Sequence, residues 1–127
     1  MTTFGPPTPI LRIFDEAKAR EFYLDFLGFE ITFEHRFGDN FPLYMGIHRG
    51  ECHLHLSEHP GDCTPGARVR VPVADLRAYI RGLREKDYRY AKPGEPEEMP
   101  WGEIAISIGD AFGNRLTFFE TLPVSTD

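Results

Sequence analysis

The chain has 127 residues, of which 41% are hydrophobic and 27% charged, and its formal net charge is −6. This length suits one domain, at about 100–200 residues per domain, and the composition is that of an ordinary globular protein. The negative charge argues against nucleic-acid binding, which depends on neutralising phosphates, and no apolar run reaches the ~20 residues of a membrane-spanning helix.

The first half begins with a short predicted strand at Ile10–Phe14. Asp15 is a suitable helix N-cap, and apolar residues spaced i, i+3, i+4 and i+7 from Ala19 to Phe26 predict a helix over about 15–27 that ends at Gly28. Three strand-like runs follow, at Phe29–Phe37, Leu43–His48 and Cys52–Ser57. The first half therefore has the predicted order β-α-β-β-β.

The second half repeats this order. Alternation at Arg68–Val73 predicts a strand, and Asp75 is the expected N-cap of a second helix over about 75–86. The remaining segments are a short strand at Tyr88–Ala91, an acidic proline-rich loop at Pro93–Pro100, and strands at Glu103–Ile108 and Arg115–Glu120. The halves therefore predict two similar modules.

We expect one α+β domain over residues 1–127, with module 1 at about 8–57, a linker at 58–66 and module 2 at about 67–121. In each module one helix covers one face of a curved sheet, so the other face stays uncovered. Two such sheets facing each other would form a partly closed sheet around a cleft, and ligands bind in clefts.

Polar side chains are expected on the uncovered faces. His53 and His55 lie two residues apart on a strand and so share one face, where they are either two metal ligands or polar residues lining a wet cleft. Arg68 and Arg70 share a strand face opposite three valines. That arginine face looks either into the cleft or a subunit interface, or into solvent.

Three aromatic residues stand beside loops. Trp101 is the only tryptophan and lies between the acidic loop and a strand, where it is either a platform for stacking a ligand or a plug in the core. Phe33 and Phe37 flank a polar segment, and the core is the ordinary place for each of them.

The compartment follows from the N-terminus and the cysteines. The first residues have neither the basic nor the apolar region of a signal peptide. Cys52 and Cys63 form no CxxC motif and are too few for a disulfide framework. We therefore expect a cytoplasmic protein with two reduced thiols.

Two motifs carry a family resemblance. The stretch FYLDFLGF at 22–29 resembles the helix–strand junction of the glyoxalase/bleomycin resistance/extradiol dioxygenase superfamily, and DAFGN at 110–114 resembles its turn before the last strand. The doubled β-α-β-β-β order is that superfamily's vicinal oxygen chelate fold. The resemblance covers about residues 8–121 and implies the fold more firmly than the function.

Within the superfamily the chain is most similar to bleomycin resistance proteins, through Pro100-Trp101-Gly102 and through Pro9 in the first strand. That similarity implies a homodimer with strand exchange at Pro9. It also implies antibiotic resistance by sequestering a cationic or aromatic ligand, such as bleomycin, between subunits without chemistry. The expected ligand-binding residues are Phe33, Phe37, His55, Arg68 and Trp101.

Metal-dependent members of the superfamily place ligands on the first, fourth, fifth and eighth strands. The resemblance puts Thr8, His55, Arg68 and Thr117 at these positions. Only His55 is a metal ligand by chemistry, and the Arg68 cation would repel a metal ion. The resemblance therefore implies no metal and no cofactor. The alternative is a lyase- or dioxygenase-type enzyme of the superfamily that uses a metal near His55.

Overall fold

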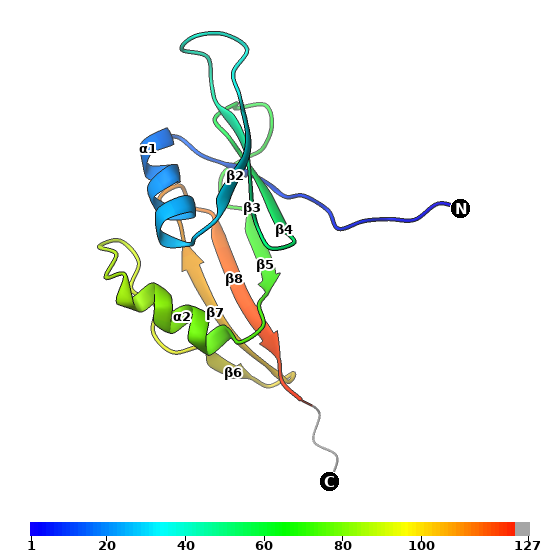
Figure 1. The fold of residues 1–127 in the computed structure, drawn as a ribbon, viewed down its shortest axis with the longest axis vertical. Coiled ribbons are helices and arrows are strands. Elements are labelled where there is room, and N and C mark those ends of the chain that lie inside the picture. Colours follow the sequence, from blue (N-terminus) through cyan, green and yellow to red (C-terminus); the bar gives the residue numbers. More distant parts are fainter. Residues whose placement is uncertain (124–127) are drawn as a thin grey trace.

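The computed structural model describes residues 1–123, which form two four-stranded sheets (Figure 1). The first sheet, in the order β1-β4-β3-β2, contains β1 (Ile10–Arg12), β2 (Glu30–His35), β3 (Tyr44–Arg49) and β4 (Cys52–Ser57). The second, in the order β5-β8-β7-β6, contains β5 (Arg68–Pro72), β6 (Glu97–Met99), β7 (Glu103–Gly109) and β8 (Arg115–Thr121). In each sheet one edge strand, β1 or β5, is parallel to its neighbour and the other pairings are antiparallel. The predicted α+β class and the repeated β-α-β-β-β order are confirmed.

The first helix begins as α1 (Glu16–Ala19) and continues as the π-helical segment η1 (Arg20–Phe26). Its predicted cap is present, because the backbone N–H of Lys18 donates to the Asp15 carboxylate at 2.9 Å. Gly28 follows with a φ of 85°, which favours glycine and ends the helix as predicted. No helix among the described residues is long and apolar enough to cross a bilayer.

Helix α2 (Leu76–Glu85) begins differently from the prediction. Asp75 precedes it in a left-handed conformation, with φ 56° and ψ 51°, and its side chain makes no capping bond. Instead, the Glu120 carboxylate of β8 accepts the backbone N–H groups of Asp75 and Leu76 at 2.9 and 3.0 Å. These two bonds lower the pKa of Glu120. An anion from a distant strand thus stabilises the positive end of the helix dipole.

The prediction of a strand at Tyr88–Ala91 is wrong. The strand that pairs with β7 is β6, which lies inside the segment expected to be a loop. A turn with Gly102 at a φ of 89° joins β6 to β7, so the two strands form a hairpin. Tyr88 instead packs its ring against Phe26, with 4.8 Å between the ring centroids.

Both modules contribute to one hydrophobic core, which lies on the helix side of both sheets. Hydrogen bonds cross between the modules there: the Tyr23 hydroxyl donates to Asp110 at 2.6 Å, and the Asn114 side-chain amide donates to the Arg12 carbonyl at 2.7 Å. Burial raises the pKa of Tyr23 well above its usual value, so its hydroxyl remains a donor. The opposite side of each sheet stays outside this core, and we call it the open face of that sheet.

Candidate functional site

The open face of the first sheet carries a cluster of three rings from three strands: Phe33, Tyr44 and His55. The Tyr44 hydroxyl and His55 Nδ1 are 2.7 Å apart, and the Phe33 ring meets the His55 ring edge-on at 5.2 Å between centroids. Gly46 lies between Phe33 and His55 in the strand register. A side chain at Gly46 would overlap the Phe33 ring, so glycine is what lets that ring lie against the sheet.

The charge state of this cluster is set by burial. Burial, with a smaller contribution from the nearby His53, lowers the pKa of His55, while burial raises the pKa of the Tyr44 hydroxyl. The imidazole is therefore neutral and the phenol protonated at neutral pH. A neutral, largely aromatic patch of this kind suits a planar apolar ring better than a charged group.

Phe37 lies beyond the ring cluster, in the loop between β2 and β3. Its ring meets His35 at 4.6 Å and His59 at 6.0 Å, both edge-on. Phe33 is 39% exposed and Phe37 is 74% exposed, so neither belongs to the core. The structure thus brings Phe33 and His55 together and places Phe37 further along the same module.

The open face of the second sheet carries Trp101 at the tip of the β6–β7 hairpin. Its indole N–H donates to the Glu103 carboxylate at 2.6 Å, and the Arg70 guanidinium donates to both oxygens of that carboxylate at 3.0 and 2.7 Å. Arg70 also lies over the Phe119 ring at 4.2 Å. Trp101 is 68% exposed, so it is not a core plug.

Glu103 holds this arrangement together, because it is buried and accepts from Arg70 and Trp101 at once. The bonds from Arg70, and next from Trp101, lower the pKa of its carboxyl group. From the sequence, Glu103 was only one of several acidic residues near Trp101. Its role depends on the hairpin, which turns Trp101 back over the first residue of β7.

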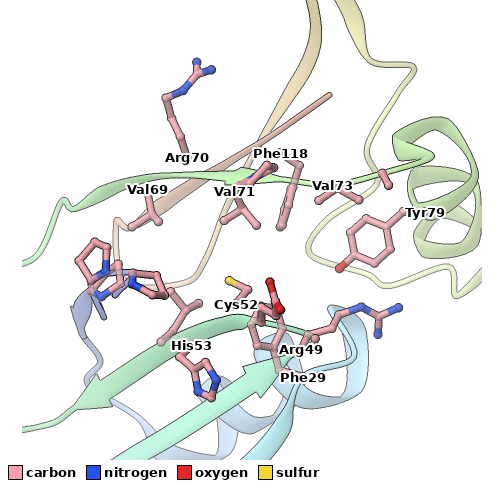
Figure 2. Close-up of a pocket in the computed structure, with 18 residues that line it drawn as sticks. Phe29, Arg49, Cys52, His53, Val69, Arg70, Val71, Val73, Tyr79 and Phe118 are labelled. Atoms are coloured by element: carbon pink, nitrogen blue, oxygen red, sulfur yellow. The ribbon is translucent and has the colours of Figure 1, made fainter. Parts of the chain in front are cut away.

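The predicted division of β5 is confirmed. Figure 2 shows Arg70 pointing away from Val69, Val71 and Val73, which face the helix side. Arg68 lies two residues before Arg70, on the same face, and is exposed. Arg68 and Trp101 thus share the open face of the second sheet.

A cavity of about 980 Å³ lies along the seam between the modules, and we call it the seam cavity (Figure 2). Its walls come from the β5 valines, from the turn between β3 and β4, and from prolines before β1. Burial raises the pKa of the Cys52 thiol and raises the pKa of Tyr79 to about 12. Neither group is therefore a ready nucleophile. The cavity joins segments far apart in the chain, which is why no local pattern predicted it.

The two aromatic patches lie on different sheets. In Figure 1 the loop between β2 and β3, which carries Phe37, is at the top, and the β6–β7 hairpin that carries Trp101 is at the bottom. Among residues 1–123 the Trp101 ring pairs with no other aromatic ring, and no hydrogen bond joins it to the first sheet. One chain therefore presents two separate aromatic patches.

A family model described as "Glyoxalase superfamily protein" matches residues 2–124. The chain belongs to the glyoxalase superfamily. A search among curated proteins finds no match for it.

Solved structures share the fold of this glyoxalase-superfamily protein over nearly its whole length. A bleomycin-binding protein complexed with bleomycin is 24% identical, with a TM-score of 0.70, covering 93% of this chain and 99% of the other. A bleomycin-binding protein from bleomycin-producing Streptomyces verticillus, complexed with copper(II)-bleomycin, is 27% identical, with a TM-score of 0.63 and coverages of 98% and 100%. TnmS3, an antibiotic-binding protein from Streptomyces sp. CB03234, is 18% identical, with a TM-score of 0.69 and coverages of 95% and 99%. All three of these proteins of the same fold bind an antibiotic.

The residues of this superfamily member do not fit the metal that some members use. Among residues 1–123, no group of three or more His, Cys, Asp or Glu side chains is placed to hold a metal ion. His53 and His55 share one face, as predicted, but the residues beside His55 in the register are Ile10 and Gly46, which offer no ligand atom. His53 instead lies beside His48, with 5.6 Å between the ring centroids.

Proposed function

We propose that the protein binds a small molecule with a planar aromatic ring system in a crevice between two copies of the chain. The Phe33–Tyr44–His55 cluster of one subunit and Trp101 of the other form the two walls. The observation that carries this proposal is that these patches lie on different sheets and share no ring contact or hydrogen bond within one chain, so a second copy is what would bring them together.

The geometry of Trp101 supports this role. An indole that is exposed yet held by a hydrogen bond to Glu103 presents a large flat surface and loses little conformational freedom when a ligand stacks on it. Each aromatic contact is worth about 0.5–1.5 kcal/mol beyond the apolar area that it buries. Proteins of similar structure that bind bleomycin or another antibiotic add independent support.

The negative charge beside Trp101 is smaller than the number of acidic residues around it suggests, because some of their carboxylates are paired with arginines. Glu95 is paired with Arg84 at 3.0 Å, and Glu103 is paired with Arg70. Glu97 and Glu98 of β6 remain exposed. A cationic group on the ligand is therefore favoured only at the β6 end of the crevice, where these two carboxylates lie.

The N-terminal arm supports a dimer. The Pro9 carbonyl accepts the backbone N–H of His55, but the first residues of the chain run away from both sheets, and Phe4 is 95% exposed (Figure 1). We propose that this arm crosses to the partner near Pro9 in a two-fold dimer, the commonest closed assembly. Light scattering is expected to give twice the 14.6 kDa of a single chain. A mass of one chain at micromolar concentration would contradict the proposal.

Bleomycin and planar aromatic dyes are suitable probes, because quenching of Trp101, the only tryptophan, reports directly on the proposed wall. Trp101→Ala is expected to weaken binding by about tenfold or more in calorimetry, since it removes the main stacking surface. Tyr90→Ala is the matched control, because Tyr90 is a similarly exposed aromatic residue outside both patches. If no probe at about 100 μM gave either binding heat or quenching of Trp101, the proposed function would be overturned.

Mixed dimers test whether the site lies between subunits. Trp101→Ala and Phe33→Ala homodimers each have two defective sites. After subunit exchange, a heterodimer of the two variants has one site with both wild-type rings and one site with neither. Recovery of about half of the wild-type sites per heterodimer supports a shared site. No recovery would show that each site lies within one chain.

A further inference from the structure

Two arginines lie side by side on the open face of the second sheet. Arg68 is the first residue of β5 and Arg115 the first of β8, and the parallel register pairs them directly. Both side chains are exposed, and neither forms an ion pair with any carboxylate of residues 1–123. Like charges directly opposite each other in a sheet are destabilising. The fold therefore keeps a repulsive pair that nothing in the described chain relieves.

The next residue on the same face of β5 shows the contrast. Arg70 is held by both oxygens of Glu103 and lies over Phe119, so its charge is already satisfied. In the register row of Arg70, next to the free pair on this face, are two hydroxyl groups, those of Thr117 and Ser107, which lie 2.7 Å apart. Because one of these hydroxyls donates to the other, the second is free to donate one hydrogen bond to a bound oxygen atom.

These groups suit an oxyanion. Guanidinium groups bind carboxylate, sulfate and phosphate through paired N–H donors, and their charge raises the strength of each bond. Two guanidinium groups, neither paired with a carboxylate, and one hydroxyl of the neighbouring row offer donors on the same face. The net charge of −6 gives no hint of this, because the acidic residues lie elsewhere.

We propose that the ligand carries an anionic group, a carboxylate, sulfate or phosphate, bound between Arg68 and Arg115, with its aromatic part toward Trp101. This inference rests on the proposed function and names the chemical class of its ligand. Gly109, the register partner of Arg115, lies six residue steps along β7 from Glu103, which is about 20 Å along a strand. The long side chains of Arg68 and Arg115 shorten this gap, so the anionic group stands on an extended ligand or a flexible arm.

Pyrenedodecanoate and its neutral amide make a matched pair of probes, since both carry the same ring system and the same long arm. The carboxylate is expected to bind about tenfold tighter than the amide. Arg68→Ala and Arg115→Ala each bring the two affinities close together, while Arg81→Ala, an exposed arginine of α2, leaves the preference unchanged. Equal affinities of the wild-type protein for the two probes, measured through quenching of Trp101, would overturn the proposal of an anionic group. Aromatic binding would remain supported.

A second measurement separates this inference from the proposed function. In NMR titrations, sodium sulfate is expected to shift the backbone signals of Arg68, Arg115 and Thr117 more than sodium chloride at equal ionic strength. Sulfate shifts without any pyrene binding would retain the oxyanion site and remove the aromatic one. No specific sulfate shifts, or a dimer that dissociates when Arg68 becomes alanine, would overturn the oxyanion site.

Discussion

Replacing Tyr23 by phenylalanine tests the link between the two modules. The hydroxyl is fully buried on η1 and donates to the Asp110 carboxylate at 2.6 Å, whereas the ring keeps its place when only the oxygen is removed. A hydrogen bond to a charged group contributes about 1.5–3 kcal/mol. Asp110 still accepts from Phe112 and Asn114, so it is not left unpaired and the loss falls at the lower end, about 1.5 kcal/mol.

Urea unfolding at one fixed protein concentration measures this loss. With a slope of about 1–3 kcal/mol per molar urea, the midpoint is expected to fall by about 0.5–1.5 M. Tyr90→Phe is the control, because Tyr90 is 59% exposed, and its free energy of unfolding is expected to stay within about 0.5 kcal/mol of wild type. A Tyr23→Phe protein as stable as this control would show that the contact with Asp110 gives no net stability.

Two further predictions concern pH. Glu120→Gln is expected to lower the melting temperature at neutral pH, because it removes the negative charge that accepts the backbone N–H groups at the start of α2. Since the pKa of Glu120 is lowered from 4.5, the difference in melting temperature from wild type is expected to shrink as pH falls below that value. A difference that stays constant with pH would contradict this role. The pKa of His55 is lowered from 6.5, so the unfolded chain binds the proton first and stability is lost as pH falls below 6.5. In urea unfolding at about pH 7.5 and about pH 5.5, His55→Gln is expected to lose less stability than wild type between the two values, and an equal loss would exclude His55 as a source.

Local patterns were sufficient to predict most of the strands and both helices. The alternation of Cys52–Ser57, for example, gives β4 with the same bounds, because one face of that strand is buried and the other is not. The errors arise where a distant segment decides the outcome. Asp75 has the right residue type for a cap, but Glu120 is brought to the helix by the β5–β8 pairing. Tyr88 lies in a segment that alternates like a strand, yet its ring packs on Phe26.

The candidate site could be predicted only in part for the same reason. Periodicity was enough to place Arg68 and Arg70 on one face, as the register confirms. Arg115 was not singled out, because only the parallel register shows that it lies beside Arg68. The buried role of Glu103 and the seam cavity likewise depend on contacts between separate segments, which no single stretch of sequence contains.

The core shared by the modules has a consequence for how the chain can be divided. Residues 58–67, between β4 and β5, add no strand to either sheet, so a cut there leaves every strand pairing intact. Each fragment alone, however, would expose the apolar helix side of its sheet to water. The two pieces therefore make a natural split protein: produced as separate polypeptides, they are expected to fold only on meeting, with a stability that rises with their concentration.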